Sequence, residues 1–295
     1  MTSRKQTLPS ISQRMKSSSG QRINIAGWSI RVLLIMIAII QLFPLVWLVD
    51  FSLLKSGDFF GSSILKWPDP PQWINYKNAF TQGKVPLYFL NSAIVTIVTI
   101  VATVISSLFM AYACTRMQWK LRGVFYNLIL VGMIIPVYST LIPNFQIFNK
   151  LGMLDSYWSL ILPNVAFAIP LGMFILSGFM ESIPRSLEEA AVMDGLGLGG
   201  LIFKIILPMT LPAIATVTVM TFISTWNEFI MAITYIRSET FKTLPFALVQ
   251  FTGQYASNYA AQFAVMTLIA LPSVVIYFLF TEQITSSVTA GAVKG

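Results

Sequence analysis

Histidine is absent from the 295 residues of the sequence, and cysteine occurs once, as Cys114. A chain without histidine cannot form a Ser-His-Asp triad, a histidine general base or the usual histidine-containing zinc site. A single cysteine excludes an intrachain disulfide, a CxxC redox pair and a cysteine-cluster metal site. We therefore expect no metal site in this chain.

Charged residues are scarce as well. They make up 10% of the chain, hydrophobic residues make up 56%, and the mean hydropathy is +0.74. Because about a quarter of the residues in a soluble domain are charged, this composition predicts that lipid surrounds most of the chain. The net charge of +8 would suit nucleic acid, but basic residues at the ends of membrane helices explain it equally well, and we expect no nucleic-acid partner.

Six stretches of the sequence contain no Asp, Glu, Lys or Arg and are long enough to cross a bilayer, which takes about 20 apolar residues. A very apolar soluble helical protein would need charged helix faces, which these stretches lack. The expected fold class is therefore all-α, a polytopic membrane protein with six transmembrane helices. Hydropathy places these helices at 30–53, 88–114, 124–145, 158–180, 207–235 and 263–284.

The orientation follows from the Lys and Arg residues in the connections. Of the 19 basic residues, twelve lie on the side that holds both termini and seven on the other, which predicts cytoplasmic termini. We expect a basic N-terminal tail at 1–29, a six-helix transmembrane domain at 30–284 and a short C-terminal tail at 285–295. No A-x-A cleavage site follows the first apolar run, so this run is interpreted as a membrane helix and not as a signal peptide.

Prolines lie inside several of these helices, among them Pro136, Pro163, Pro170, Pro208 and Pro212. A proline in a membrane helix frees a carbonyl and bends the axis, which suits a helix that lines a cavity. Prolines are also simply more frequent in membrane helices, and both interpretations stay open.

The segment 184–207, between the fourth and fifth predicted spans, contains helix start and stop signals that a plain connecting loop would not need. Ser186 and Glu189 have the spacing of a capping box, which predicts the start of a helix. Gly195 ends it, because glycine readily adopts the left-handed conformation, and a second short helix is expected from about Leu198 to Pro208. The first helix is expected to place four residues on one face: Leu187, Ala190, Ala191 and Asp194.

Residues 195–200 of this segment read G-x-G-x-x-G, the dinucleotide-binding fingerprint. That pattern needs a preceding strand and an acidic residue about 20 positions later, whereas here a helix precedes it and a membrane span follows. The chain also lacks the P-loop pattern G-x-x-x-x-G-K-[ST]. ATP-driven work would therefore belong to a partner subunit.

Taken together, Glu189-Ala-Ala191, Asp194-Gly195, Phe203 and Leu207-Pro208 resemble the EAA loop of ABC importer permeases. Four further segments are similar to the carbohydrate branch of that family, the maltose-transporter type of permease: Ala111–Ala113, Leu151–Tyr157, Trp226–Phe229 and Thr289–Gly295. The resemblance covers about residues 30 to 295.

The resemblance implies that segment 184–207 is a cytoplasmic coupling loop that binds a nucleotide-binding subunit. It implies a second homologous permease chain, a dimer of ATPase subunits that hold ATP and Mg, an extracytoplasmic sugar-binding protein and surrounding membrane lipid. The chain itself would hold no cofactor and would not be an enzyme, and it would lie in the cell membrane of a prokaryote. The implied ATPase-coupling residues are Glu189, Ala190, Ala191, Asp194, Gly195, Phe203 and Pro208.

A sugar needs hydrogen-bonding groups and an aromatic face to stack on, and polar and aromatic residues within the spans could supply both. Tryptophan and tyrosine also favour the membrane interface, and Glu228 could simply mark the water boundary. The candidate substrate-pathway residues are Asn91, Tyr138, Asn164, Trp226, Asn227 and Glu228.

Two further sets of residues gain a role only from the resemblance. Gln254, Tyr255, Asn258 and Tyr259 would contact the sugar-binding protein, although the residues alone are equally typical of an ordinary loop. Gly291, Lys294 and Gly295 would insert between the ATPase subunits, although by composition they form only a frayed end.

The expected function is that of a permease subunit of an ATP-driven, binding-protein-dependent importer of sugars or oligosaccharides, working by alternating access. An ABC permease for an amino acid, a polyamine or a peptide stays open, because the EAA loop does not separate these solutes. An ion-driven secondary transporter would need an ionisable relay inside the spans, which the uncharged stretches do not offer. An intramembrane enzyme is disfavoured by the lack of histidine and of paired buried carboxylates.

Overall fold

The computed structural model describes residues 25–59, 67–253 and 258–292, and their side chains between residues 28 and 281. These residues form helices and connecting turns, and the described part of the chain contains no strand. The chain divides into two compact units, residues 1–47 and residues 48–295. The described part of the first unit is the larger part of helix α2 (Ile25–Ser52), and every side chain from Trp28 to Val46 is exposed.

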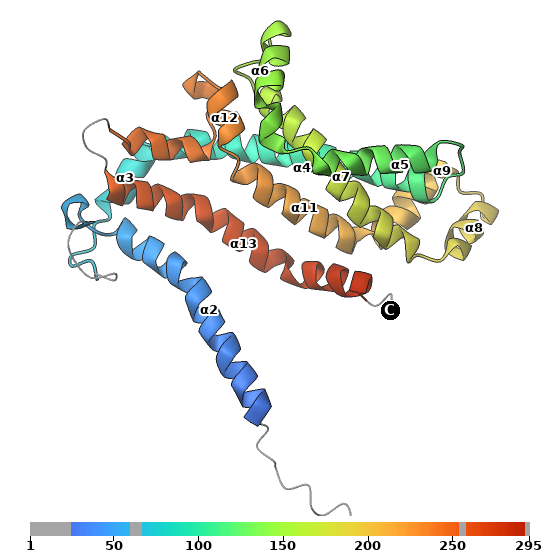
Figure 1. Ribbon diagram of the computed structural model, residues 1–295, viewed down its shortest axis with the longest axis horizontal. Helices are drawn as coiled ribbons and strands as arrows, with labels where there is room; N and C mark the ends of the chain where they lie inside the picture. Colours follow the sequence, from blue (N-terminus) through green and yellow to red (C-terminus); the bar gives the residue numbers. More distant parts are fainter. Residues whose placement is uncertain (1–24, 60–66, 254–257, 293–295) are drawn as a thin grey trace, which may run out of the picture. The chain divides into compact units, whose positions relative to one another are not determined.

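The second unit is a helical bundle in which α4 packs along α7, and α11 packs against α4, α7 and α13 (Figure 1). Small and hydroxyl-bearing side chains let α4 and α7 approach closely, as is typical of membrane helices. A Cβ added at Gly172 of α7 would lie only 2.5 Å from Ser107 Oγ of α4. The long helices of this unit are α4 (Val85–Thr115), α7 (Trp158–Glu181), α11 (Leu211–Trp226) and α13 (Tyr259–Ala292).

Four predicted membrane helices are confirmed as continuous helices long and apolar enough to span a bilayer, and their apolar stretches are Trp28–Ser52, Val85–Thr115, Trp158–Glu181 and Tyr259–Thr281. The all-α polytopic fold is thus confirmed. Their boundaries differ by a few residues from the predicted ones. Helix α13 begins four residues earlier than predicted, because the carboxamide oxygen of Asn258 accepts a hydrogen bond from Ala261 N at 3.1 Å and caps it.

The prediction of one helix at 124–145 is wrong. The chain forms α5 (Arg122–Val131), the short 3-10 turns Gly132–Ile134 and Val137–Thr140, and α6 (Leu141–Lys150), with a bend of 93° between the two halves. Ile135 is extended with ψ 118°, because the ring of Pro136 disfavours helical geometry in the preceding residue.

The prediction of one helix at 207–235 is also wrong. The chain from Leu198 to Met209 meets α11 at an angle of 75°. Pro212 lacks the N–H that would bond to the carbonyl of Pro208, so the helix stops at Thr210. Helix α11 then ends at Trp226, and the short helix α12 (Ile230–Tyr235) follows after three residues.

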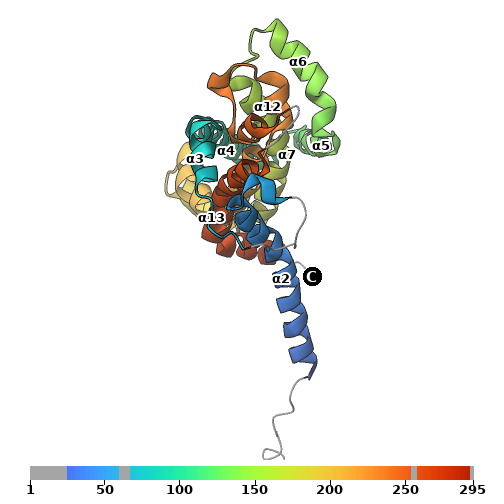
Figure 2. The same ribbon diagram turned by 90° about the vertical axis from the view of Figure 1, so that its left-hand side faces the viewer.

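Helix α6 of the first broken segment and α12 of the second lie side by side at one end of the bundle. The hydroxyl of Tyr235 in α12 donates to Leu141 O of α6 at 3.2 Å, and its ring packs edge to face on Phe148. Figures 1 and 2 show α6 and α12 together at that end, which we call the α12 end. Helix α8 (Arg185–Met193) lies at the opposite end, which we call the α8 end.

The remaining elements are short, and most of them gather near the α12 end: η1 (Ser56–Phe59), α3 (Ile74–Thr81), η5 (Glu239–Phe241) and η6 (Leu244–Phe251). At the α8 end the chain after α8 forms α9 (Leu198–Leu201), a π-helical turn η4 (Ile202–Ile206) and α10 (Leu207–Met209). Two apolar clusters stabilise the bundle, one around Tyr88, Trp226 and Tyr235, the other around Leu108 and Met173.

Candidate functional site

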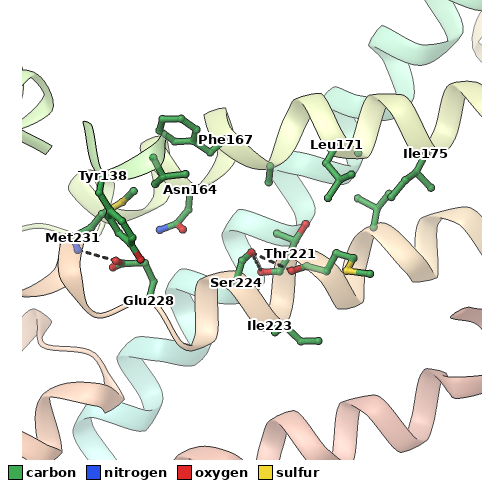
Figure 3. A pocket seen from close by; sticks show the side chains of 15 residues that line it. Tyr138, Asn164, Phe167, Leu171, Ile175, Thr221, Ile223, Ser224, Glu228 and Met231 are labelled. Carbon is green, nitrogen blue, oxygen red and sulfur yellow. Dashed lines mark hydrogen bonds between the residues drawn. The ribbon is translucent and has the colours of Figure 1, made fainter. Parts of the chain in front are cut away.

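A cavity of about 500 Å³ lies between α7 and α11 (Figure 3). Helix α7 lines it with one face, since its contributing residues recur at helical spacing: Asn164, Phe167, Ala168, Leu171, Gly172 and Ile175. Helix α11 lines the other side with Val217, Met220, Thr221, Ile223 and Ser224. Val137 and Tyr138 of the first broken segment and Glu228 and Met231 of the second complete the lining.

The break at Pro136 and the break after Trp226 fall at this cavity, whereas the break at Thr210 does not. Irregular backbone in a membrane protein is tolerated where it is buried in protein or lines a cavity. The bend at Pro136 brings Tyr138 to the cavity, and the interruption after Trp226 brings Glu228 to it. Pro136 stands at the first of these breaks, so for this proline the structure favours the interpretation that it helps to shape a cavity. No proline stands in the second break, and Pro163 and Pro170 lie inside the continuous helix α7.

The polar groups of the cavity gather near one end. Asn164 donates one N–H to Leu160 O at 2.8 Å, and its side chain reaches into the cavity beside Tyr138 (Figure 3). Glu228 accepts hydrogen bonds from Met231 N at 2.7 Å and from Ala232 N at 3.1 Å, so its carboxylate caps the start of α12. The other end is apolar, with Leu171 and Ile175 of α7 in view.

Of the six residues predicted to line a substrate pathway, the structure brings Tyr138, Asn164 and Glu228 together around this cavity. Asn91 lies elsewhere: it donates to Thr240 O and Lys242 O, both at 2.8 Å, and accepts from the hydroxyl of Tyr157.

Trp226 and Asn227 also lie outside the cavity lining. Trp226 is buried, stacks on Phe222 and donates its indole N–H to Ile269 O of α13 at 3.1 Å. Asn227 is exposed and donates to Ile223 O at 2.8 Å, at the end of α11. Both side chains therefore make contacts that shape α11.

Two polar residues of the lining, Thr221 and Ser224, were missed by the sequence reasoning. The signal was present, because Thr221 and Ser224 precede Glu228 at intervals of three and four residues, the spacing of one face in the helix predicted at 207–235.

Segment 184–207 contains the expected pair of short helices with a turn between them. Gly195 has φ +83°, Gly195 N bonds to Val192 O, and Leu196 N bonds to Ala191 O at 3.0 Å, so α8 ends in a Schellman motif. The second helical stretch runs from Leu198 to Met209, as predicted, although residues 202–206 are π-helical.

The predicted capping box is wrong. Helix α8 begins at Arg185, and no side chain caps it, because the extended Pro184 takes the capping position. Ser186 therefore falls inside the first turn, where its hydroxyl cannot reach the free N–H groups.

The residues predicted to contact an ATPase are mostly exposed on this segment. Ala191 is the exception, since it is buried against the bundle. Phe203 is 58% exposed and its ring meets Phe109 of α4 edge to face. The exposed set is Glu189, Ala190, Asp194, Gly195, Phe203 and Pro208.

The residues predicted to contact a binding protein are only partly described. Gln254 and Tyr255 lie outside the described residues. Asn258 accepts a hydrogen bond from the hydroxyl of Ser56 at 2.6 Å, and the ring of Tyr259 lies 5.6 Å from that of Phe59. Of the predicted tail contacts, Gly291 belongs to α13, while Lys294 and Gly295 lie outside the described residues.

At the α12 end, Asp155 joins two turns of the chain. Its carboxylate accepts hydrogen bonds from Arg237 N at 2.9 Å, from Ser238 N at 2.8 Å and from the Ser238 hydroxyl at 3.0 Å. Burial raises the pKa of Asp155, but the bonds from Ser238 and Arg237 lower it more, so the pKa lies below its ordinary value. Within the described residues no three metal-ligating side chains come together.

Apolar membrane helices, broken helical segments around a cavity and an exposed short helix at one end are the features expected of a membrane permease. The chain belongs to the family described as binding-protein-dependent transport system inner membrane component, which residues 103–289 match. It is therefore a multi-pass membrane subunit of the ABC importer class.

Relatives and solved structures agree with this assignment. The chain is 34% identical over 283 residues to the probable ABC transporter permease protein YurM of Bacillus subtilis, with 95% of this chain and 93% of that protein covered. It is 31% identical to the sulfoquinovosyl glycerol transport system permease protein SmoH of Agrobacterium fabrum, with 86% and 89% covered.

Other relatives are permease proteins of transport systems for diacetylchitobiose, galactooligosaccharides and trehalose or maltose. The fold matches a chain of a bacterial ABC transporter that imports alginate, with a TM-score of 0.75, 23% identity, and 94% of this chain and 99% of that chain covered.

Proposed function

We propose that this chain forms one half of the transport pathway of an ATP-driven importer for neutral or charged sugars and oligosaccharides. The relatives whose names give a solute are transport proteins for sugars or glycosides, including diacetylchitobiose and galactooligosaccharides. The solute would pass the cavity between α7 and α11 by alternating access. No bond chemistry takes place in this chain.

The observation that carries this proposal is the chemistry of the cavity. A sugar presents hydroxyl groups along its rim and an apolar face made by its C–H groups, so it needs both polar partners and a surface to pack on. Tyr138, Asn164 and Ser224 supply hydrogen-bonding groups, and Phe167 adds an aromatic ring. The apolar remainder of the lining would let the solute slide without being held tightly.

ATP would act through α8. Glu189 and Ala190 are exposed on it, and a short side chain next to a carboxylate permits a close approach with a charge-assisted bond to a basic residue of the partner. Asp194, Gly195, Phe203 and Pro208 are exposed as well and would add to this contact. ATP and Mg would bind to the ATPase subunits that dock there.

The proposed assembly contains further partners. A second homologous permease chain would complete the pathway, and membrane lipid would cover the exposed apolar side chains of the spans. A sugar-binding protein would dock at the α12 end, on the extracytoplasmic side, through Gln254, Tyr255, Asn258 and Tyr259. Both termini would be cytoplasmic, with Gly291, Lys294 and Gly295 near the ATPase subunits, in the membrane of a prokaryote.

The test is to purify the chain in mild detergent from its native cells, identify what copurifies, and reconstitute the assembly in vesicles. We expect an ATPase with a P-loop, a second permease and a secreted binding protein, and ATP-dependent uptake of a labelled oligosaccharide. A chain that stays alone at every detergent strength, or an assembly that takes up an amino acid and no sugar, would contradict the proposal.

A further inference from the structure

The side chain of Arg116 lies where three helices meet at the α8 end. Arg116 follows the last residue of α4, a helix of 31 residues with no charge, and its backbone N–H bonds to Tyr112 O at 2.9 Å. Its side chain is only 5% exposed. A buried guanidinium carries five N–H donors, and it is stable only if acceptors surround it.

Its partners are two backbone carbonyls, which accept hydrogen bonds, and one carboxylate, which forms an ion pair with it. Arg116 Nε lies 3.2 Å from Glu188 Oε1 of α8, and the side chain of Glu188 is 13% exposed. Arg116 Nη2 donates to Ile183 O at 2.7 Å and also to Met180 O. The hydroxyl of Tyr112, one turn earlier on α4, donates to Glu188 Oε2 at 3.4 Å.

The placement of these charges is favourable for both helices. Met180 lies in the last turn of α7, where free carbonyls form the negative end of the helix dipole and attract a cation. Glu188 lies in the first turn of α8, where free N–H groups attract an anion. A lysine could neutralise Glu188 but could not hold several acceptors with a planar fork.

The same guanidinium fixes the turn between α7 and α8. Met180 and Ile183 stand on either side of Ser182, where α7 ends. Because one nitrogen of Arg116 binds both carbonyls, the turn cannot open without breaking these bonds. Ala191, three residues after Glu188, is buried against the same cluster of side chains as Tyr112 and Met180.

We propose that the ion pair of Arg116 and Glu188 joins α8 to the ends of α4 and α7 as one rigid body, so that motion imposed on α8 moves the α7 wall of the cavity. This inference rests on the proposed function, in which α8 binds the ATPase. Arg116 and Glu188 are positioning residues, since neither lines the cavity. The exposed neighbour Glu189 contacts the partner, and Glu188 transmits the motion inward.

The test uses the complete transporter in vesicles and measures ATP hydrolysis and oligosaccharide uptake in the same preparation. Glu188→Gln removes the charge and keeps the shape, and Arg116 keeps its bonds to the two carbonyls. We expect ATPase subunits to stay bound and hydrolysis to continue, while sugar moved per ATP falls about tenfold, within the usual range of coupling between sites. Glu239→Gln, the same change at an exposed carboxylate of the α12 end, should leave this ratio unchanged.

Two results would overturn the inference: an unchanged ratio of uptake to hydrolysis in Glu188→Gln, or a parallel loss of both activities. Glu189→Arg separates the inference from the proposed function beneath it. If Glu189→Arg leaves ATPase binding and both activities intact, the docking of α8 to an ATPase is wrong, whatever Glu188→Gln does.

A distance measurement covers the case in which Glu188→Gln fails to assemble. The transporter that keeps Arg116 and Glu188 and carries Cys114→Ala takes spin labels at Met117→Cys after α4 and at Met193→Cys on α8, both exposed positions. A rigid body predicts one narrow distance that stays the same when ATP is added. A distance that changes with ATP would contradict the proposal.

Discussion

Glu228 Oε1 accepts a hydrogen bond from Met231 N at 2.7 Å, so the carboxylate at the polar end of the cavity is also the residue that starts α12. Glu228, which the sequence predicts to line the substrate pathway, thus also forms hydrogen bonds to the backbone of α12. The same carboxylate accepts from Ala232 N with its other oxygen. The cap of α12 thus uses both carboxylate oxygens of Glu228.

Glu228→Gln should therefore loosen α12. An amide has one acceptor oxygen, and its NH₂ group would face a backbone N–H, so a charged hydrogen bond worth about 1.5–3 kcal/mol is lost. We expect a lower thermal unfolding temperature of the purified chain in detergent and slower uptake. Glu239→Gln, at an exposed ion pair with Lys84, should change the unfolding temperature little. Equal effects of the two substitutions would contradict the capping role.

Because α4 and α7 lie in close contact, two glycine-to-alanine substitutions in α7 should change the stability of the chain in opposite directions. Gly172→Ala would put a Cβ 2.5 Å from Ser107 Oγ and 3.1 Å from Ser107 Cβ, and such overpacking costs about 1–3 kcal/mol. Gly178→Ala, later in α7, meets nothing within 4 Å and should be neutral or stabilising by up to about 1 kcal/mol.

Thermal unfolding of both variants measures this difference. Ser107→Gly should restore part of the stability of Gly172→Ala, because it removes the two close atoms of Ser107 and leaves Val217 Cγ1 at 3.2 Å. If Gly172→Ala unfolds at the wild-type temperature, the helices are farther apart than described.

Cavity residues should affect uptake, and their neighbours outside the cavity should not. Asn164→Ala and Tyr138→Phe each remove one hydrogen-bonding group, so the concentration of oligosaccharide at half-maximal uptake should rise about five- to tenfold. Asn227→Ala, an exposed residue outside the lining, is the matched control. A larger effect at Asn227 than at Asn164 would place the pathway elsewhere.

The lowered pKa of Asp155 predicts that the stability of the folded chain depends on pH. Its pKa is lower in the folded chain than in the unfolded one, where it is about 3.9. The stabilisation is therefore fully present above the unfolded pKa and is lost as the pH falls through the folded pKa. Asp155→Asn should lower the unfolding temperature at pH 7 and flatten its decline below about pH 4. Asp69→Asn, at an exposed position, is the control. If the unfolding temperature of Asp155→Asn falls with pH as steeply as that of the wild type, this role of Asp155 is contradicted.

The sequence predicted where helices lie better than where they break. Charge-free stretches located the four continuous spans within a few residues, because hydrocarbon tolerates no unpaired backbone and few charges. Pro163 and Pro170 lie inside the continuous α7, whereas Pro136 and Pro212 stand at breaks. Local sequence does not distinguish these prolines, because the carbonyl that each one frees is satisfied or not by the neighbouring helices.

The same limit explains the candidate residues. Asn91 and Asn164 are both asparagines inside a predicted span, yet Asn91 binds the backbone of the Thr240–Lys242 loop and Asn164 reaches the cavity. The role of Asn91 depends on contacts with residues about 150 positions later in the sequence. The role of Asn164 depends on the bend at Pro136, which forms part of the cavity. By contrast, the end of α8 at Gly195 was predictable, because a Schellman motif depends only on residues within one turn.

The most direct test of the central claim is to ask whether a sugar occupies the cavity between α7 and α11. In the complete transporter with Cys114→Ala, Ala168→Cys places a thiol in the cavity lining and Asn227→Cys places one outside it. We expect the transported oligosaccharide to slow the modification of Ala168→Cys by a small thiol reagent and to leave the modification rate of Asn227→Cys unchanged. Equal modification rates of Ala168→Cys with and without the sugar, during measurable uptake, would contradict it.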